Sequence, residues 1–197
     1  MRIAILGGTF NPVHNGHLNV AREVKRRFVY DRIIFIPANI PAHKSIEADA
    51  GAAHRLRMLQ LAVAEDEDFL VDDCELRRGG TSYTIDTIRE LPQRYPLEGR
   101  PGLIIGDDLV EDFKTWRDVE RLVAMVDLII AHRRTPAEVD IEYPCRYVDN
   151  SLFPVSSSRV RDAVRMNSRM AGEGVESSEK WLPPSVAEYI ACHELYR

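Results

Sequence analysis

The sequence predicts an α/β fold in which helices join the strands of a parallel sheet. A short apolar run at residues 3–6 is followed by a glycine-rich turn, an amphipathic stretch and a second apolar run at residues 32–37. A strand, a helix and a strand in so short a stretch favour parallel pairing with a right-handed crossover. Apolar runs that end in polar turns return at residues 103–108 and 127–134. The chain has 197 residues, enough for one sizeable core, so we expect a single domain over residues 1–197.

The first turn, at residues 7–18, carries the clearest chemical signal. It reads Gly-Gly-Thr-Phe-Asn-Pro-Val-His-Asn-Gly-His-Leu and leads into a helix that we expect to end near Phe28. Glycine lets a ligand approach the backbone, and the start of a helix presents unpaired N–H groups at the positive end of its dipole. A phosphate would fit there, although the turn is neither a Walker A loop nor a Gly-x-Gly-x-x-Gly loop.

Two histidines, His14 and His17, stand in this turn in place of the lysine of a Walker A loop. Their i, i+3 spacing lets both side chains face one point near the helix start. The alternative is half of a metal site, but no third ligand, such as the glutamate of a His-Glu-x-x-His motif, is evident nearby. We therefore expect a phosphate site and no metal ion held by the protein.

The loop after the second strand should share a crevice with the first turn, because parallel sheets bind ligands at the carboxyl ends of their strands. This loop contains Asn39 and ends in Lys44, whose ammonium group could reach a phosphate. A solvated loop lysine is the alternative. Residues 52–64 then show helical spacing, and we expect a structural helix with Arg55 and Arg57 on its polar faces.

A glycine-rich stretch at residues 77–84 follows a probable third strand at residues 69–71 and approaches another helix. Ser82 or Thr84 would cap that helix, which is the commonest use of these residues before an apolar periodic run; ligand binding is the alternative. Tyr83 would either join the core or line a pocket.

Two further positions suit a nucleotide. Asp107 ends the apolar run that begins at residue 103, where an aspartate can accept hydrogen bonds from ribose hydroxyls or cap a helix. Residues 115–118 have the character of a capping box. Trp116 within them would either stack on a flat ring or anchor the core.

The last third of the chain predicts a second anion site. Residues 127–131 predict a strand that ends in arginines suited to a phosphate or a carboxylate. Residues 156–161 place three serines and two arginines at a helix start, which suits a phosphate or is simply a good N-cap. Residues 166–180 lose the periodicity, so we expect a mobile segment, and residues 181–197 predict a C-terminal helix.

Composition restricts the class of partner. The formal net charge is −5, and both signs are scattered, which argues against binding of nucleic acid and favours small substrates. Three separated cysteines without a Cys-x-x-Cys motif predict a reducing cytoplasm. No apolar run approaches the roughly 18 residues of a membrane span, so we expect no membrane partner. The sequence leaves open whether the chain forms a homo-oligomer.

The motif Gly-Gly-Thr-Phe-x-Pro-x-His-x-Gly-His and the later Ser-Ser-x-x-x-Arg together resemble the nucleotidylyltransferase superfamily. The whole chain is similar to the bacterial nicotinate-nucleotide adenylyltransferase family, through residues 39–44, 82–87, 106–108, 115–116 and 182–190. The resemblance implies a Rossmann-like nucleotidylyltransferase fold. It also implies the reaction of ATP with nicotinate mononucleotide to give deamido-NAD and pyrophosphate, in NAD biosynthesis.

The resemblance also implies roles for particular residues. The catalytic residues would be His14, His17, Lys44 and Arg161, with His17 nearest the α-phosphate. ATP would contact Gly7, Gly8, Thr9, Phe10, His14, His17, Gly106, Ser157, Ser158 and Arg161. The mononucleotide would contact Asn39, Lys44, Tyr83, Thr84, Asp107, Trp116, Arg117 and Arg133, with the Trp116 ring stacked on the nicotinate ring. Mg²⁺ would arrive on the phosphates of ATP, without a cage of protein ligands.

The chain departs from the family pattern in a few places. Asn11 stands where aspartate is common, Ala42 where a second proline is common, and residues 166–180 are more acidic than the usual basic lid. Three alternatives remain at this stage: another phosphate acceptor, such as nicotinamide mononucleotide; a non-catalytic nucleotide sensor; and a hydrolase that uses a metal on His14 and His17.

Overall fold

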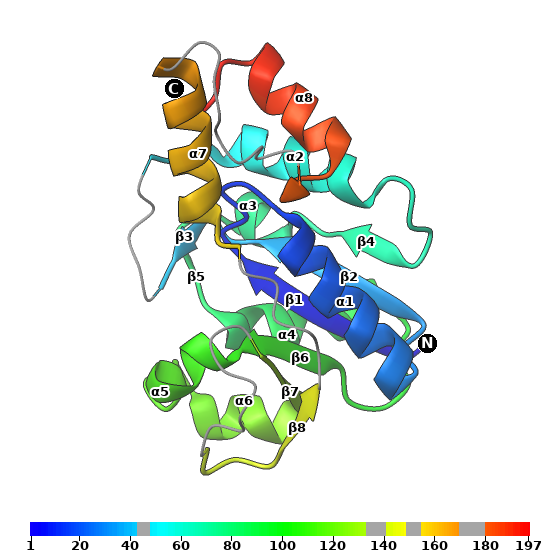
Figure 1. Ribbon diagram of the computed structural model, residues 1–197. Coiled ribbons are helices and arrows are strands. Elements are labelled where there is room, and N and C mark those ends of the chain that lie inside the picture. The colour runs from blue at the N-terminus through cyan, green and yellow to red at the C-terminus, as the bar shows by residue number, and fades with distance from the viewer. Residues whose placement is uncertain (43–47, 133–140, 149–154, 170–179) are drawn as a thin grey trace.

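The computed structural model of the chain describes residues 1–42, 48–132, 141–148, 155–169 and 180–197, with only the backbone for residues 167–169. Within these residues, six strands form one sheet in which every neighbouring pair is parallel (Figure 1). In spatial order they are β4 (Phe69–Val71), β2 (Arg32–Pro37), β1 (Ile3–Gly8), β6 (Gly102–Gly106), β7 (Asp127–Ala131) and β8 (Cys145–Val148). The chain therefore winds outward in both directions from β1, and the predicted parallel α/β fold is confirmed.

This strand order matters for binding because the direction of winding reverses between β1 and β6. In open parallel sheets, ligands bind beyond the carboxyl ends of the strands at such a reversal. Gly7 and Gly8, expected in the turn, are the last two residues of β1, so the turn leaves the sheet after Gly8; Asp107 follows the end of β6. The two stretches that the sequence analysis singled out thus meet at the point where the topology favours a crevice.

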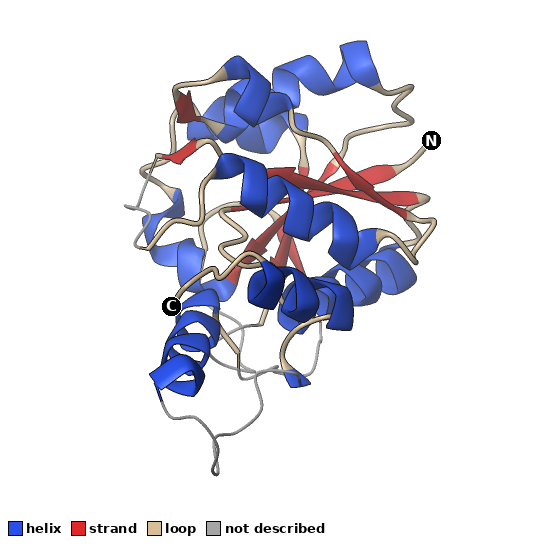
Figure 2. Cartoon of the chain, turned by 90° about the horizontal axis from the view of Figure 1, so that it is seen from above, coloured by secondary structure: helices blue, strands red, loops and turns tan. Residues whose placement is uncertain are grey.

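Both faces of the sheet are apolar, and helices cover both (Figure 2). Along β1, Ala4 and Leu6 join one buried cluster and Ile3 and Ile5 the other, because side chains alternate along a strand. The first cluster includes residues of α1 (Asn15–Phe28), α2 (Ala52–Val63), α7 (Ser157–Arg169) and α8 (Pro184–Cys192). The second includes residues of α3 (Cys74–Arg78), α4 (Thr84–Arg94), α5 (Val110–Phe113) and α6 (Val119–Met125).

A short parallel ribbon joins β3 (Ile40–Pro41) to β5 (Thr81–Ser82). It ties the loop after β2 to the segment that precedes α4. The prediction that Ser82 or Thr84 caps α4 is wrong: Tyr83 occupies the N-cap position without a side-chain cap, and Thr84 is the first helical residue. Ser82 is instead committed to the ribbon, a long-range pairing that local propensity does not reveal.

Other local expectations met mixed outcomes. The first helix ends at Phe28 and the second helix lies where expected, with Arg57 exposed, but Arg55 is buried at 1% exposure. Residues 115–118 form no capping box, because α6 is preceded by Asp118 in a left-handed conformation without a side-chain cap. Helix α7 continues to Arg169, past the predicted break, and residues 170–179 lie outside the described residues. No described helix is long and apolar enough to cross a membrane.

Burial of Cys74 in the core predicts that its thiol reacts slowly. Burial, together with the charges of Asp72 and Glu75, raises the pKa of this thiol from 9.0 to about 12. At pH 8 its thiolate population, and hence its rate of labelling by a disulfide reagent, should be lower than that of an ordinary thiol by about a thousandfold. Exposed Cys192 should label quickly. In the variant Cys145→Ser/Cys192→Ser, Cys74 is the remaining cysteine. Unfolding this variant in urea should raise its labelling rate to that of an ordinary thiol. Rapid labelling of the folded variant would contradict the expectation.

Candidate active site

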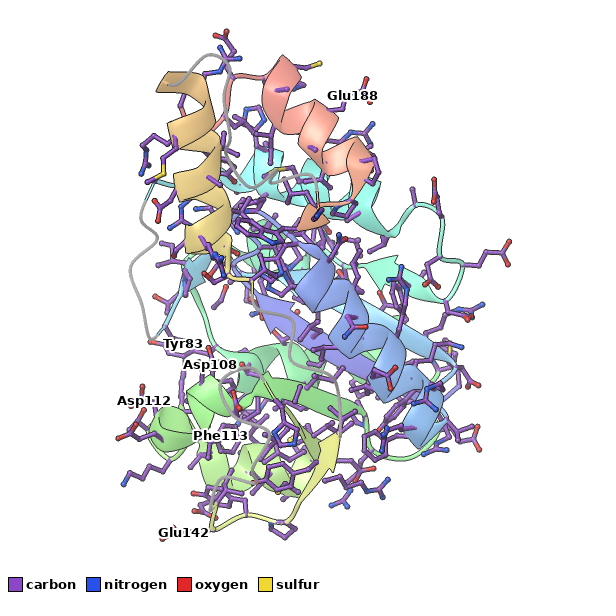
Figure 3. The ribbon with its side chains drawn as sticks, viewed as in Figure 1. Tyr83, Asp108, Asp112, Phe113, Glu142 and Glu188 are labelled. Carbon is purple, nitrogen blue, oxygen red and sulfur yellow. The ribbon has the colours of Figure 1, made fainter. Side chains whose placement is uncertain are left out.

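A cavity of about 590 Å³ lies at the carboxyl ends of the central strands. Its wall is made by the ends of β1, β2, β6 and β7 and by the starts of α1, α4 and α7. A volume of this size suits a nucleotide-sized ligand. Tyr83 and Asp108, both labelled in Figure 3, mark this end of the sheet. The cavity therefore lies where the reversal of the strand order predicts a ligand site.

The structure brings all of the predicted ATP contacts together around this cavity. The residues from that set that line it are Gly7, Gly8, Thr9, Phe10, His14, His17, Gly106, Ser157, Ser158 and Arg161. Of the predicted mononucleotide contacts, Thr84 and Trp116 line the cavity, whereas Asn39, Tyr83, Asp107 and Arg117 are not part of its wall. Lys44 and Arg133 lie outside the described residues.

The turn from β1 to α1 is buried, so its backbone carbonyls need partners inside the protein. The Arg55 guanidinium donates to the Thr9 carbonyl (2.9 Å). The Arg161 guanidinium donates to the Asn11 carbonyl (2.8 Å), and the Ser157 hydroxyl donates to the Pro12 carbonyl (2.9 Å). Arg161 and Ser157 thus hold the turn in shape as well as facing the cavity.

The Asn11 side chain links this turn to distant parts of the chain. Its amide nitrogen donates to the Ala48 carbonyl (3.2 Å), and its oxygen accepts from the Ala50 N–H (3.3 Å) and from the Tyr196 hydroxyl (2.7 Å). Burial raises the pKa of the Tyr196 phenol, so the hydroxyl stays protonated as a donor. An aspartate at position 11 would lack the amide donor, so asparagine fits this arrangement of partners.

The two histidines lie face to face at the start of α1. Their ring centroids are 3.7 Å apart. The backbone N–H of His14 donates to Nδ1 of the His17 ring (3.2 Å). Because Nδ1 accepts, the neutral His17 ring carries its proton on Nε2, which makes Nε2–H a donor. A Cβ on Gly16 would lie only 3.0 Å from Nδ1 of His14, so the glycine permits this stacking.

Space for a ligand lies directly against the backbone of the turn. A Cβ added at Gly7, which lines the cavity, would meet nothing within 4 Å, whereas one at Gly8 would meet the Phe10 ring at 3.0 Å. The Phe10 ring in turn packs edge-on against the His17 ring, with centroids 5.0 Å apart. One glycine therefore leaves the cavity open, and the other admits the ring that supports His17.

Glu75 and Thr87, which the sequence patterns did not indicate, line the cavity together with Ser82 and Thr84. The Thr87 hydroxyl donates to Oε1 of Glu75 (2.6 Å), and the Ser82 hydroxyl accepts from the Asn39 N–H (2.9 Å). Burial raises the pKa of Glu75, although hydrogen bonds from Thr87 and Ser82 oppose this shift. Its position shortly after a strand end, the signal applied to Asp107, could have identified Glu75.

Aromatic and acidic side chains complete the wall beyond β6. Trp116 lines the cavity, and its ring packs on Phe113 with centroids 4.9 Å apart, as expected of a core anchor. Stacking of this ring on a ligand stays a prediction. Asp107 is buried at the start of a short 3₁₀ turn, and its neighbour Asp108 is the aspartate that lines the cavity. Tyr83 lies beneath the Arg117 guanidinium, 4.7 Å from ring centroid to Cζ, outside the wall. No three metal-binding side chains among the described residues gather to hold a metal ion.

Comparison with known proteins agrees with this geometry. A family model described as cytidylyltransferase-like matches residues 5–163. A probable nicotinate-nucleotide adenylyltransferase from Borrelia garinii subsp. bavariensis is 40% identical over 196 residues, covering 100% of this chain and 95% of that protein. Another from Bacillus licheniformis is 37% identical over 195 residues, covering 99% of this chain and 98% of that protein.

A solved structure shares the fold. The Plasmodium falciparum nicotinic acid mononucleotide adenylyltransferase complexed with NaAD superposes with a TM-score of 0.76 at 20% identity, covering 99% of this chain and 97% of that chain. The fold, the histidine turn at the end of β1 and the full-length similarity agree. This chain therefore belongs to the cytidylyltransferase-like family and, within it, to the nicotinate-nucleotide adenylyltransferases.

Proposed function

We propose that this protein transfers the adenylyl group of ATP to nicotinate mononucleotide, releasing pyrophosphate and forming deamido-NAD in NAD biosynthesis. One observation supports this above all others. A single cavity has a glycine and histidine turn at one side and the start of α4, with Trp116 nearby, at the other. Two substrates can therefore lie end to end across the reversal point of the sheet, as a transfer between them requires.

In the proposed reaction, an oxygen of the mononucleotide phosphate attacks the α-phosphorus of ATP. The new P–O bond forms as the bond to the leaving pyrophosphate breaks, in line, so the protein needs no covalent nucleophile. Its contribution is to orient the two substrates and to stabilise the charge that develops on the α-phosphate. Nε2–H of His17 suits the second task, because the backbone of His14 fixes its tautomer.

The remaining phosphate contacts follow from the second anion site. We propose that Ser157, Ser158 and Arg161 hold the β- and γ-phosphates at the start of α7, and that Lys44 neutralises the transferring group. Mg²⁺ would be carried by the phosphates and water, without a cage of protein ligands. When bound, the ion would neutralise charge on the departing pyrophosphate.

The mononucleotide would occupy the side of the cavity near α4. Thr84, the first residue of this 11-residue helix, lines the cavity, so the positive end of the helix dipole faces the ligand. We propose that Thr84 and backbone N–H groups near Arg117 receive the nicotinate carboxylate while Trp116 stacks on the ring. Asp108, which lines the cavity, and Arg133 would hold the ribose and phosphate.

The role proposed for His17 can be tested by the variant His17→Ala. We expect it to bind ATP but to release pyrophosphate several hundred-fold more slowly, because one preorganised donor to the transition state is lost. His54→Ala is the matched control, since His54 lies in α2 and contacts the Tyr189 hydroxyl. Turnover of His17→Ala close to that of the control, in a coupled pyrophosphate assay at saturating ATP, would refute the assignment.

The acceptor can be tested by comparing nicotinate and nicotinamide mononucleotide in the same assay. We expect kcat/KM to favour nicotinate by about tenfold or more, because a carboxylate gains more than a neutral amide from the start of a helix. Thr84→Val should narrow this preference, whereas Thr81→Val, on the exposed ribbon, should leave it unchanged. Equal kcat/KM values for the two acceptors would contradict the proposed pocket, and binding of ATP without turnover on either acceptor would favour a nucleotide sensor.

A further inference from the structure

Arg55 is the largest of the fully buried side chains, with 1% of its surface exposed. It projects from α2 into the region behind the cavity, but it is not part of the cavity wall. Burying a guanidinium costs free energy unless its N–H groups find hydrogen-bond acceptors inside the protein. The acceptors that surround it show what the side chain holds together.

Most of these acceptors are backbone carbonyls from two loops. Nη1 of Arg55 donates both to the Thr9 carbonyl (2.9 Å) and to the Ala38 carbonyl (2.7 Å). Nη2 lies 3.4 Å from the Asn39 carbonyl, and Nε donates to Oδ1 of Asp49 (3.0 Å). One nitrogen atom thus bridges the turn after β1 and the loop after β2.

These two loops serve opposite halves of the proposed reaction. Thr9 belongs to the turn proposed to receive ATP, and Asn39 belongs to the loop proposed to hold the mononucleotide. Both Thr9 and Ala38 line the cavity. The sheet already pairs the bases of the two loops, because the Ala38 N–H donates to the Gly8 carbonyl (2.9 Å). Carbonyl oxygens carry partial negative charge and repel each other, so a donor placed between those of Thr9 and Ala38 holds the loops together beyond this last pair.

We propose that Arg55 is a positioning residue that sets the spacing between the ATP turn and the mononucleotide loop, so that the two substrates meet in line. This inference rests on the proposed adenylyl transfer. Reacting atoms must lie about 3–3.5 Å apart, and a displacement of about 1 Å can cost about a hundredfold in rate. Arg55 acts on this distance through the backbone and touches neither substrate.

A lysine cannot reproduce this arrangement. Its ammonium group keeps the positive charge beside Asp49, but it is a compact point charge without the planar fork that reaches several carbonyls at once. Arg55→Lys should therefore fold and yet hold the two loops less accurately. Arg57, two positions along the same helix, is exposed, and Arg57→Lys is the matched control.

The experiment measures kcat, both KM values and the dissociation constants of ATP, nicotinate mononucleotide and the dinucleotide product for wild type, Arg55→Lys and Arg57→Lys. We expect Arg55→Lys to lower kcat about a hundredfold while each KM changes by less than about threefold. Affinity for the dinucleotide, which spans both loops, should fall by at least about tenfold more than affinity for either substrate alone. Arg57→Lys should match wild type in every quantity.

The outcomes separate this proposal from the proposed function and from a purely structural role. Wild-type kcat in a folded Arg55→Lys protein overturns the inference but leaves the adenylyl transfer intact. Parallel losses of affinity for both substrates and the product also overturn it, because they indicate a general disturbance of the site. Absence of turnover in wild type contradicts the proposed function itself. If Arg55→Lys folds incompletely, Arg55→Gln is measured as well, and each kcat is expressed per folded molecule from near-ultraviolet circular dichroism.

Discussion

The site depends on how the backbone carbonyls of one turn find hydrogen-bond donors. The chain between β1 and α1 leaves the sheet, and residues 10–14 are buried, so the carbonyls of this turn need partners within the protein. Side chains from α2 and α7 meet this requirement: Arg55 donates to Thr9, Arg161 to Asn11 and Ser157 to Pro12. Each donor lies far from the turn in sequence. A loop that would otherwise be flexible is thereby fixed in the shape that stacks the two histidines.

The sheet explains why these donors can converge. Its two faces are covered by separate groups of helices, and the strand order reverses between β1 and β6, so the ends of central strands open toward one space. Helices α2 and α7 lie on the same face as α1 (Figure 1), and an arginine of each donates to a carbonyl of the turn. The β3–β5 ribbon then brings Ser82 beside Asn39 on the far side of the cavity. Fold and site are therefore specified by the same contacts.

The sequence predicted those parts of the site that one local motif contains. His14, His17 and the glycines share a single turn, and Ser157 and Arg161 share one helix start, so spacing alone indicated a common use. Position after a strand end indicated an aspartate beyond β6, but the 3₁₀ turn at that point decides which of Asp107 and Asp108 faces the cavity. Such a choice depends on about one residue of register, which periodicity does not resolve.

The rest of the site depends on pairings between segments distant in sequence. Arg55 was expected on a polar face because helical spacing says nothing of carbonyls supplied by other loops, and a buried arginine is rare enough that exposure is the natural expectation. Ser82 was expected to cap a helix because it precedes an apolar periodic run. Its partner strand is only two residues long and gives no signal in the sequence. These residues could be placed only once the loops had been brought together in three dimensions.

The hydrogen bond from Tyr196 to Asn11 also bears on how the protein is made. The two residues are 185 positions apart, so Asn11 leaves the ribosome long before Tyr196 has been added to the chain. At roughly 5–20 residues per second, this interval is about 10–40 s. For most of that time the nascent turn also lacks the guanidinium of Arg161, which follows Asn11 by 150 positions. The set of hydrogen bonds that holds this turn is thus completed only after residue 196 has been added to the chain.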